Sequence, residues 1–189
     1  MTAELFALLR FASPALPIGS FAYSRGLEYA VHAGWVRDET STADWVSGLV
    51  EHVGAELDGP LFVRAYAAFE RGDAAAVGEW NAVAIASRES AELRLEDSQL
   101  GAALMRLLRE TGVAAARAFA GRDDVAYVTA FALAMVEQRV QLSAALGAML
   151  WAQADAQVSA AVRLVPLGQT AGQRILARLA AELPRHVAR

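Results

Sequence analysis

Most side chains that could do chemistry in this sequence fall in three polar segments of an otherwise alanine- and leucine-rich chain. In the first segment, the hydroxyls of Ser20, Tyr23 and Ser24 precede Glu28. Two prolines keep the backbone before them extended, and a glycine allows a sharp turn or a close approach. Hydroxyls and a carboxylate on a stiff loop suit hydrogen-bonded recognition. The same residues also fit an ordinary interhelical loop in which Ser24 caps the next helix, so both readings stay open.

The second segment concentrates opposite charges at the start of a leucine-rich stretch. It contains Arg88, Glu89, Glu92 and Arg94. On a helical wheel Asp97 falls on the leucine seam, where a carboxylate must be paired or its burial costs several kcal/mol. We expect either a buried Asp97 paired with Arg94, its nearest candidate partner, or a helix end that projects into solvent. No histidine or nucleophile accompanies these acids, so acid–base catalysis is not favoured.

The third segment places amide side chains on a helix face and around a helix break. Gln153 and Gln157 continue an apolar seam, which indicates that the amides enter the core or line a channel. Gln169, Gln173 and Arg174 follow a Val-Pro-Leu-Gly break. Buried glutamines bonded to backbone groups would explain the seam equally well.

Metal-ligating residues are few. Glu28 and His32 stand four residues apart, a spacing that brings two side chains to one helix face. Two ligands do not make a site, and we assign no partner at ligand spacing to His52 or His186. We therefore expect no dedicated metal site and no bound cofactor in this chain.

Composition excludes several classes of function. The seventeen basic residues are all arginine, and there is no cysteine. Without lysine there is no Walker A phosphate loop and no Schiff-base chemistry, and without cysteine no thiol nucleophile or iron–sulfur cluster. A net charge of −4 and scattered arginines argue against nucleic-acid binding. Met1–Arg10 lacks the basic start of a signal peptide, and apolar runs such as Ala144–Ala152 are too short to span a membrane. We expect a soluble, cytoplasmic protein.

The elements that must position these residues are predicted to be helices, because alanine and leucine dominate and apolar residues recur at three- and four-residue steps. Ser41 with Asp44, and Thr170 with Gln173, suggest helix starts, while Asp58-Gly59-Pro60 suggests a stop. The fold class is all-α: a single compact, bundle-like domain over residues 1–189, with about ten helices. The predicted helices are Glu4–Phe11, Ser24–Ala33, Ser41–Leu57, Pro60–Glu70, Ala74–Ser87, Glu89–Thr111, Val113–Phe119, Val125–Gln138, Ser143–Leu164 and Thr170–Leu183.

The three polar segments also carry a resemblance to a known family. The stretches ASPALPIGSFAYSRGLE (residues 12–28), AGWV (33–36), ASRESAELR (86–94) and VSAAVRLVPLGQTAGQR (158–174) resemble the urease accessory protein UreF family. With the helical pattern between them, they extend over nearly the whole chain in the family's order. The proline-glycine break flanked by glutamines is the most specific of the four.

The resemblance implies a function in urease maturation. A family member is a dimeric, non-enzymatic scaffold that binds a second accessory protein, called D or H. Together they recruit the nickel-carrying GTPase G, modulate it and deliver Ni²⁺ to apo-urease. Nickel would pass through the complex without a tight site in this chain. The family continues beyond the last helix into a tail that grips the D/H protein, so the resemblance implies that this tail lies outside the 189 residues.

The resemblance also implies which side chains face partners or line a channel. The matching positions are Ser20, Tyr23, Ser24, Glu28, Arg88, Glu89, Glu92, Gln157, Gln169, Gln173 and Arg174. The alternative reading from the residues alone is an all-α enzyme or small-ligand binder. That reading requires a closed polar pocket around Glu92, Arg94, Asp97 and Gln157.

Overall fold

The fold consists of helices and connecting loops. The computed structural model describes residues 3–188, and no strand occurs among them. This confirms the predicted all-α class. The α-helices are α1 (Ala3–Phe11), α2 (Leu27–His32), α3 (Glu39–Gly48), α4 (Gly59–Glu70), α5 (Ala74–Ala86), α6 (Ala91–Glu110), α7 (Tyr127–Glu137), α8 (Leu142–Leu164) and α9 (Gln169–Val187). Three further segments are the 3₁₀ helices η1 (Ser20–Ala22) and η3 (Ala114–Phe119) and the π-helix η2 (Leu49–Asp58).

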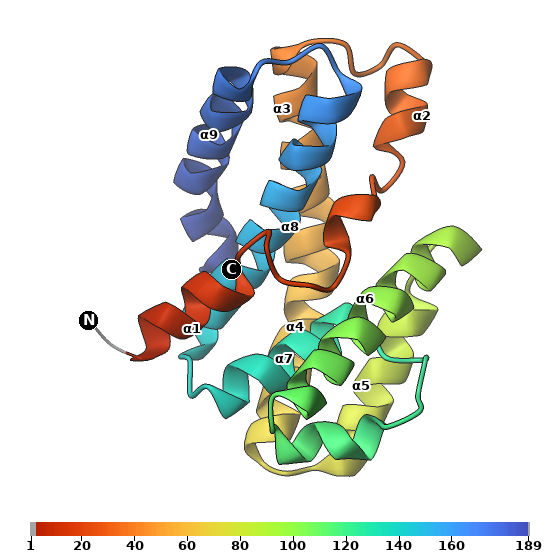
Figure 1. Ribbon diagram of the computed structural model, residues 1–189, viewed down its shortest axis with the longest axis vertical. Helices are drawn as coiled ribbons and strands as arrows, with labels where there is room; N and C mark the ends of the chain where they lie inside the picture. The colour runs from red at the N-terminus through yellow and green to blue at the C-terminus, as the bar shows by residue number, and fades with distance from the viewer. Residues whose placement is uncertain (1–2, 189) are drawn as a thin grey trace.

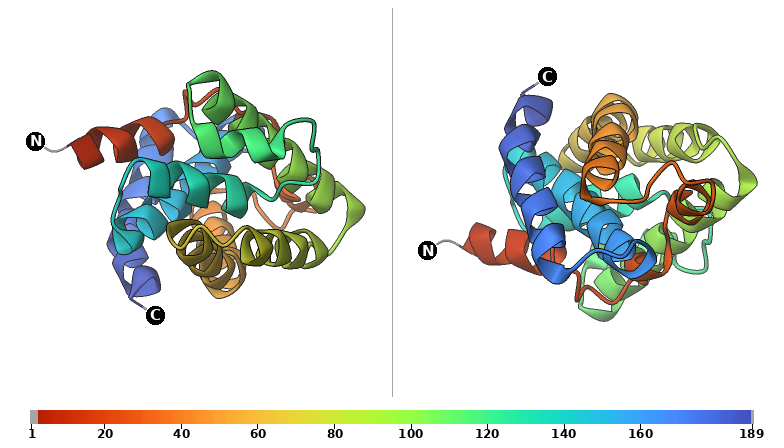
Figure 2. Two further views of the ribbon diagram at one scale, coloured as in Figure 1. Left: turned by 90° about the horizontal axis from the view of Figure 1, so that it is seen from below. Right: turned by 90° about the horizontal axis from the view of Figure 1, so that it is seen from above.

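Helix α7 is the centre of the core. Every residue from Tyr127 to Met135 is buried, because α4, α5, α6 and α8 all pack against this helix (Figure 1, Figure 2). Phe131 makes edge-to-face or tilted contacts with Phe11 and Phe62, a geometry that aromatic rings favour. A helix that is apolar all round must be enclosed in this way.

Helices α3 and α4 are joined through η2 without a break, so the predicted stop at Asp58-Gly59-Pro60 is wrong. Gly59 has right-handed helical angles, and its N–H donates to the carbonyl of Gly54 across a widened π turn. Pro60 lies in the first turn of α4, where the missing N–H is tolerated. The long rod therefore carries Asp58 into the interior.

Three predicted helix caps are also wrong. Asp38, not Ser41, is the N-cap of α3, and Ser41 is the reciprocal partner of a capping box. Helix α9 begins at Gln169 after Gly168, with no side-chain cap, so Thr170 does not cap it. Helix α2 begins at Leu27 after a left-handed Gly26 and has no side-chain cap, so Ser24 is not its N-cap.

Helices α8 and α9 form an antiparallel pair along one side of the molecule (Figure 1). The predicted break between them is confirmed, since α8 ends at Leu164 and α9 begins five residues later. A second, smaller core lies beside this pair, where Leu27 and Ala30 of α2 pack against Ala160 and Ala161 of α8. Within residues 3–188 no helix combines the length and apolarity needed to cross a membrane.

Candidate functional site

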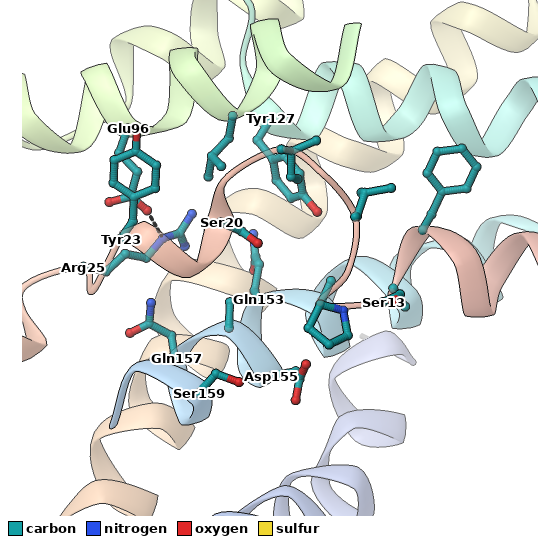
Figure 3. Close-up of a pocket in the computed structure, with 18 of the residues that line it drawn as sticks. Ser13, Ser20, Tyr23, Arg25, Glu96, Tyr127, Gln153, Asp155, Gln157 and Ser159 are labelled. Atoms are coloured by element: carbon teal, nitrogen blue, oxygen red, sulfur yellow. Dashed lines mark hydrogen bonds and ion pairs between the residues drawn. The ribbon is translucent and has the colours of Figure 1, made fainter. Parts of the chain in front are cut away.

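A loop that we call the strap, residues 12–26, crosses from α1 to α2 and lies over the middle of α8 and the first half of α6 (Figure 1, Figure 3). Its backbone adopts left-handed angles at Gly19, Arg25 and Gly26, with φ of 81°, 48° and 83°. Arginine rarely adopts such a conformation, and it persists only where surrounding contacts hold it.

Two side-chain contacts tie the strap to α6. Arg25 Nε donates to Glu96 Oε1 at 3.1 Å, and both side chains are largely buried. The Tyr23 hydroxyl donates to Gln99 Oε1. The predicted recognition loop is therefore fixed to the helix that carries the second polar segment, which the sequence could not reveal.

Under the strap lies a cavity of about 290 Å³, which we call the strap cavity (Figure 3). Ser20, Tyr23 and Gln157 line it, so three of the predicted residues come together there. Gln157 is only 5% exposed, and its Oε1 has no hydrogen-bond partner among the described residues. Unlike Gln157, Gln153 is satisfied through its Nε2, which donates to Asp58 Oδ2 at 2.9 Å. Both amides line this cavity, Gln157 as a buried residue and Gln153 as a half-buried one.

Behind the strap lies a hydrogen-bonded set of groups, the buried Asp58, Arg88 and Asp97 and the half-buried Gln153, which we call the Arg88 network. Arg88 donates from Nη1 to Asp58 Oδ1 at 2.7 Å and from Nη2 to Asp97 Oδ1 at 3.1 Å. The two carboxylates and the guanidinium are at most 6% exposed. Their attraction keeps the pKa of Arg88 raised, although burial opposes it. The network therefore joins η2, α6 and α8 to the loop before α6.

Asp97 is buried and paired, which decides between the two readings of this residue. Its partner is Arg88, however, and not the predicted Arg94, which is exposed on the outer face of α6. Burial raises the pKa of Asp97 to about 6, and the negative charge of Asp58 adds to this effect, although Arg88 works against it. The Asp97 Oδ1 atom also accepts from the backbone N–H of Tyr127, at the start of α7, at 3.4 Å.

A second cavity, of about 240 Å³, lies on the other side of the Arg25–Glu96 pair, and we call it the network cavity. Arg25 and Glu96 line both cavities, so their ion pair forms part of the wall between them. Arg88, Asp97 and the predicted Glu89 also line the network cavity.

The remaining predicted residues lie on the outside. Gln169 and Gln173 line a shallow depression with Asp155 and Ser159, and the latter two also line the strap cavity. Arg174 forms an ion pair with Glu39 of α3. Glu28 on α2 and Glu92 in the first turn of α6 are exposed, and Ser24 is half-buried in the strap.

The pocket required by the alternative reading is not assembled. Glu92 and Arg94 lie on the exposed face of α6. Asp97 lines the network cavity and Gln157 the strap cavity. These four side chains therefore do not form one closed polar site.

The histidines form no metal-ligand cluster in the described part of the chain, where no three His, Asp or Glu side chains converge. His52 does have a partner at ligand spacing, contrary to our expectation, because its Nδ1 lies 3.2 Å from Glu56 Oε2 on the exposed face of η2. The absence of a cofactor stays a prediction.

Sequence reasoning missed Arg25, Asp58, Glu96 and Tyr127 as parts of the site. Asp58 was not predicted because it belongs to the tripeptide Asp58-Gly59-Pro60, which is typical of the end of a helix. A signal for Arg25 was available, since it follows the hydroxyl-rich segment directly. Pairings between residues 71 or 30 positions apart, as for Arg25–Glu96 and Arg88–Asp58, leave no local pattern.

Known proteins similar in sequence to this chain are urease accessory proteins. The UreF family model matches residues 36–180. Urease accessory protein UreF 2 of Brucella anthropi is 48% identical over 180 residues, which cover 95% of this chain and 79% of the relative. UreF of Alkalilimnicola ehrlichii is 46% identical over 92% of this chain and 76% of the relative. A bifunctional urease accessory protein UreEF of Bordetella bronchiseptica is 45% identical over 96% of this chain and 42% of the relative. The chain therefore belongs to the UreF family of urease accessory proteins.

Proposed function

We propose that this chain is a non-enzymatic cytoplasmic scaffold in urease maturation. It binds the D/H accessory protein, recruits the nickel-carrying GTPase G through that complex and modulates it, and so helps to deliver Ni²⁺ to apo-urease. It acts as a homodimer, and neither nucleic acid nor a membrane takes part.

The observation that carries the proposal is the convergence of three family-like segments in space. The strap, the first half of α6 and the second half of α8 line the strap cavity, and Arg25 of the strap and the start of α6 also line the network cavity. Relatives that match 95–96% of this chain carry the name urease accessory protein, and in Bordetella bronchiseptica the UreF part is fused to a UreE part in one chain. Such a fusion supports a role inside an assembly.

The chemistry of the residues suits a scaffold better than a metal store. The chain has no cysteine and only three histidines, and oxygen and amide groups dominate the site. Oxygen ligands bind Ni²⁺ less tightly than the thiolate and imidazole ligands of a dedicated store. Nickel is thus cargo that contacts this chain weakly, while GTP is held by another subunit.

Partner binding rests on exposed positions, and Glu92, in the first turn of α6, offers the sharpest probe. Glu92 and Glu110 are exposed acids at opposite ends of the same helix, so Glu110→Ala is a matched control for Glu92→Ala. We expect co-expression with the D/H protein to give a stoichiometric complex on size exclusion. Glu92→Ala should weaken the assembly with D/H or G, and Glu110→Ala should leave it intact.

Cells that lack this gene provide the decisive test. We expect their urease apoprotein to be present but nickel-free, and the wild-type gene to restore nickel as measured by metal analysis of purified urease. Fully nickel-loaded urease in the deletion strain would overturn the proposal, as would failure to bind any accessory protein. Light scattering at high micromolar concentration tests the homodimer, which a strict monomer would contradict.

A further inference from the structure

The strap cavity has an apolar wall and a few polar groups that face it. Leu16 and Ile18 of the strap and Leu100 of α6 are buried apolar residues of this wall. Tyr127 of α7 and Gln153 of α8 provide polar groups. A concave, largely apolar pocket with a few converging polar groups is the usual form of a small-molecule site. The volume of about 290 Å³ lies near the lower end for such sites, so the cavity suits a ligand of few non-hydrogen atoms.

The hydroxyl of Tyr127 is the feature that points to a ligand. The residue is only 5% exposed, and its oxygen points into the space between the strap and α8 (Figure 3). This hydroxyl makes no hydrogen bond to any residue from 3 to 188, yet its oxygen is not sealed in the packing as Asp97 Oδ2 is. Burial raises the pKa of the hydroxyl, so it remains a hydrogen-bond donor at neutral pH. Buried tyrosine hydroxyls usually have a partner, so this one indicates an acceptor on a bound molecule.

Gln153 supplies a complementary acceptor. Its Nε2 donates to Asp58 Oδ2 at 2.9 Å. An ionised carboxylate can only accept, so this bond determines that Oε1 is the free end of the amide. Within the described residues Oε1 accepts no hydrogen bond, and it is not sealed in the packing. In Figure 3 the Gln153 side chain extends from α8 toward the strap, while Tyr127 approaches from α7. A donor and an acceptor therefore enter the cavity from different walls.

The charges around the cavity favour a neutral ligand. Arg25 is paired with Glu96, and Arg163, on the exposed side of α8, has an interaction of its own. Asp155 is half-buried without an ion pair in the described part of the chain, and burial raises its pKa. An anion would meet this carboxylate with no free cation to compensate it. An ammonium ion could pair with Asp155, but it offers no acceptor to Tyr127.

We propose that the strap cavity binds a small neutral molecule that carries a primary carboxamide on a short aliphatic chain. The carbonyl oxygen accepts from the Tyr127 hydroxyl, and the amide N–H donates to Gln153 Oε1. The aliphatic chain packs against Leu16, Ile18 and Leu100. A water molecule could satisfy the same hydroxyl, but it would gain nothing from this apolar wall. The inference goes beyond the proposed function and does not rest on it.

The experiment titrates butyramide into the full chain at pH 7.5 and follows saturable binding by NMR and calorimetry. Three analogues of nearly the same size test the head group: 2-pentanone lacks the N–H, butyrate is an anion and n-butylammonium is a cation. We expect 2-pentanone to bind about three- to tenfold more weakly than butyramide, and the two ions not to bind. Each methylene removed, from butyramide to propionamide to acetamide, should weaken binding about fourfold.

A matched pair of variants tests the hydroxyl itself. Tyr127→Phe removes an oxygen that makes no hydrogen bond within residues 3–188, so the fold should be kept while butyramide binds about three- to tenfold more weakly. Tyr29→Phe, which removes a hydroxyl from a residue that is 64% exposed on α2, should bind butyramide like the wild type. Far-ultraviolet circular dichroism and urea unfolding confirm that both variants are folded.

The outcomes decide the proposal. No saturable binding of butyramide, equal binding of butyrate or n-butylammonium, or unchanged binding by Tyr127→Phe would overturn it. A glutamine side chain carries the same carboxamide, so N-acetylglutamine methylamide is titrated as well. Binding of butyramide alone assigns the site to a free amide, while binding of both assigns it to a side chain presented by another protein.

Discussion

The stability of this protein should depend on pH in a way that reports the ionisation of Asp97. Burial raises the pKa of this carboxyl from 3.8 to about 6, with a further contribution from the charge of Asp58. The folded state therefore binds the proton more tightly than the unfolded state does. This contribution to stability is complete below pH 3.8 and is lost as the pH rises through 6.

The size of the effect follows from the shift. A rise of about two pKa units, at about 1.4 kcal/mol for each, makes the contribution of Asp97 about 3 kcal/mol. Asparagine keeps the shape and the oxygen that accepts from Tyr127 but does not titrate. The free energy of unfolding of Asp97→Asn, minus that of the wild type, should therefore increase by about 2 kcal/mol between pH 4.5 and pH 7 and be nearly constant above it, because part of the effect is already lost below pH 4.5.

Urea unfolding followed by tryptophan fluorescence, at several pH values from 4.5 to 8, measures this difference. Subtracting the wild-type free energy of unfolding at each pH removes the contributions of the other titratable groups. The change of the difference with pH, and not its absolute value, therefore tests the prediction. Asp38→Asn is the control, because hydrogen bonds from Ser41 lower the pKa of Asp38 below 3.8, so the corresponding difference should be nearly flat over this pH range. A flat difference for Asp97→Asn, or one that decreases with pH, would refute the reasoning.

Four further changes test the packing of the fold by urea unfolding. Arg88→Met should destabilise the protein by about 3–5 kcal/mol, because two buried carboxylates lose their shared cation; a loss below about 1 kcal/mol would contradict a buried network. Gly101→Ala should lower the free energy of unfolding by about 3 kcal/mol, because the added Cβ would lie 1.9 Å from the carbonyl oxygen of Val125. Gly78→Ala is the contrasting change, since Gly78 lies on α5 with open space around its Cβ position, and it should raise the free energy of unfolding by about 0.5–1 kcal/mol. Arg174→Ala breaks an exposed ion pair and should change stability by less than about 1 kcal/mol, which a larger loss would disprove.

Helices were predictable where periodicity is strong and local. The apolar run that forms α7 and the long seam of α8 both produced helices close to the predicted ranges. Helix N-caps were less predictable, because several polar residues near a helix start can each act as the N-cap. Asp38 and Ser41 are both good cap residues, and only the direction of the incoming chain decided which of them precedes the first turn.

The continuous rod through η2 was not predictable from its residues. Gly and Pro together usually end a helix, yet here the packing of Gly54 and Gly59 against Leu150 and Leu146 of α8 keeps the chain helical. Tertiary contacts outweighed the local preference by exploiting the absence of side chains at both glycines. As a result Asp58 points inward and meets Arg88.

The sequence by itself determined the helical class, the apolar segments that form the core, and the polar segments that resemble one family, because these depend on composition and short-range spacing. Only the tertiary structure decided the partners. Asp97 meets Arg88 rather than Arg94, because Asp97 lies on the buried face of α6 while Arg94 reaches its exposed face, and Arg25 of the strap meets Glu96. Which of those faces becomes buried depends on helices far away in the sequence. The cavities, and the unsatisfied oxygen of Asp97 beside one of them, exist only because those helices pack together.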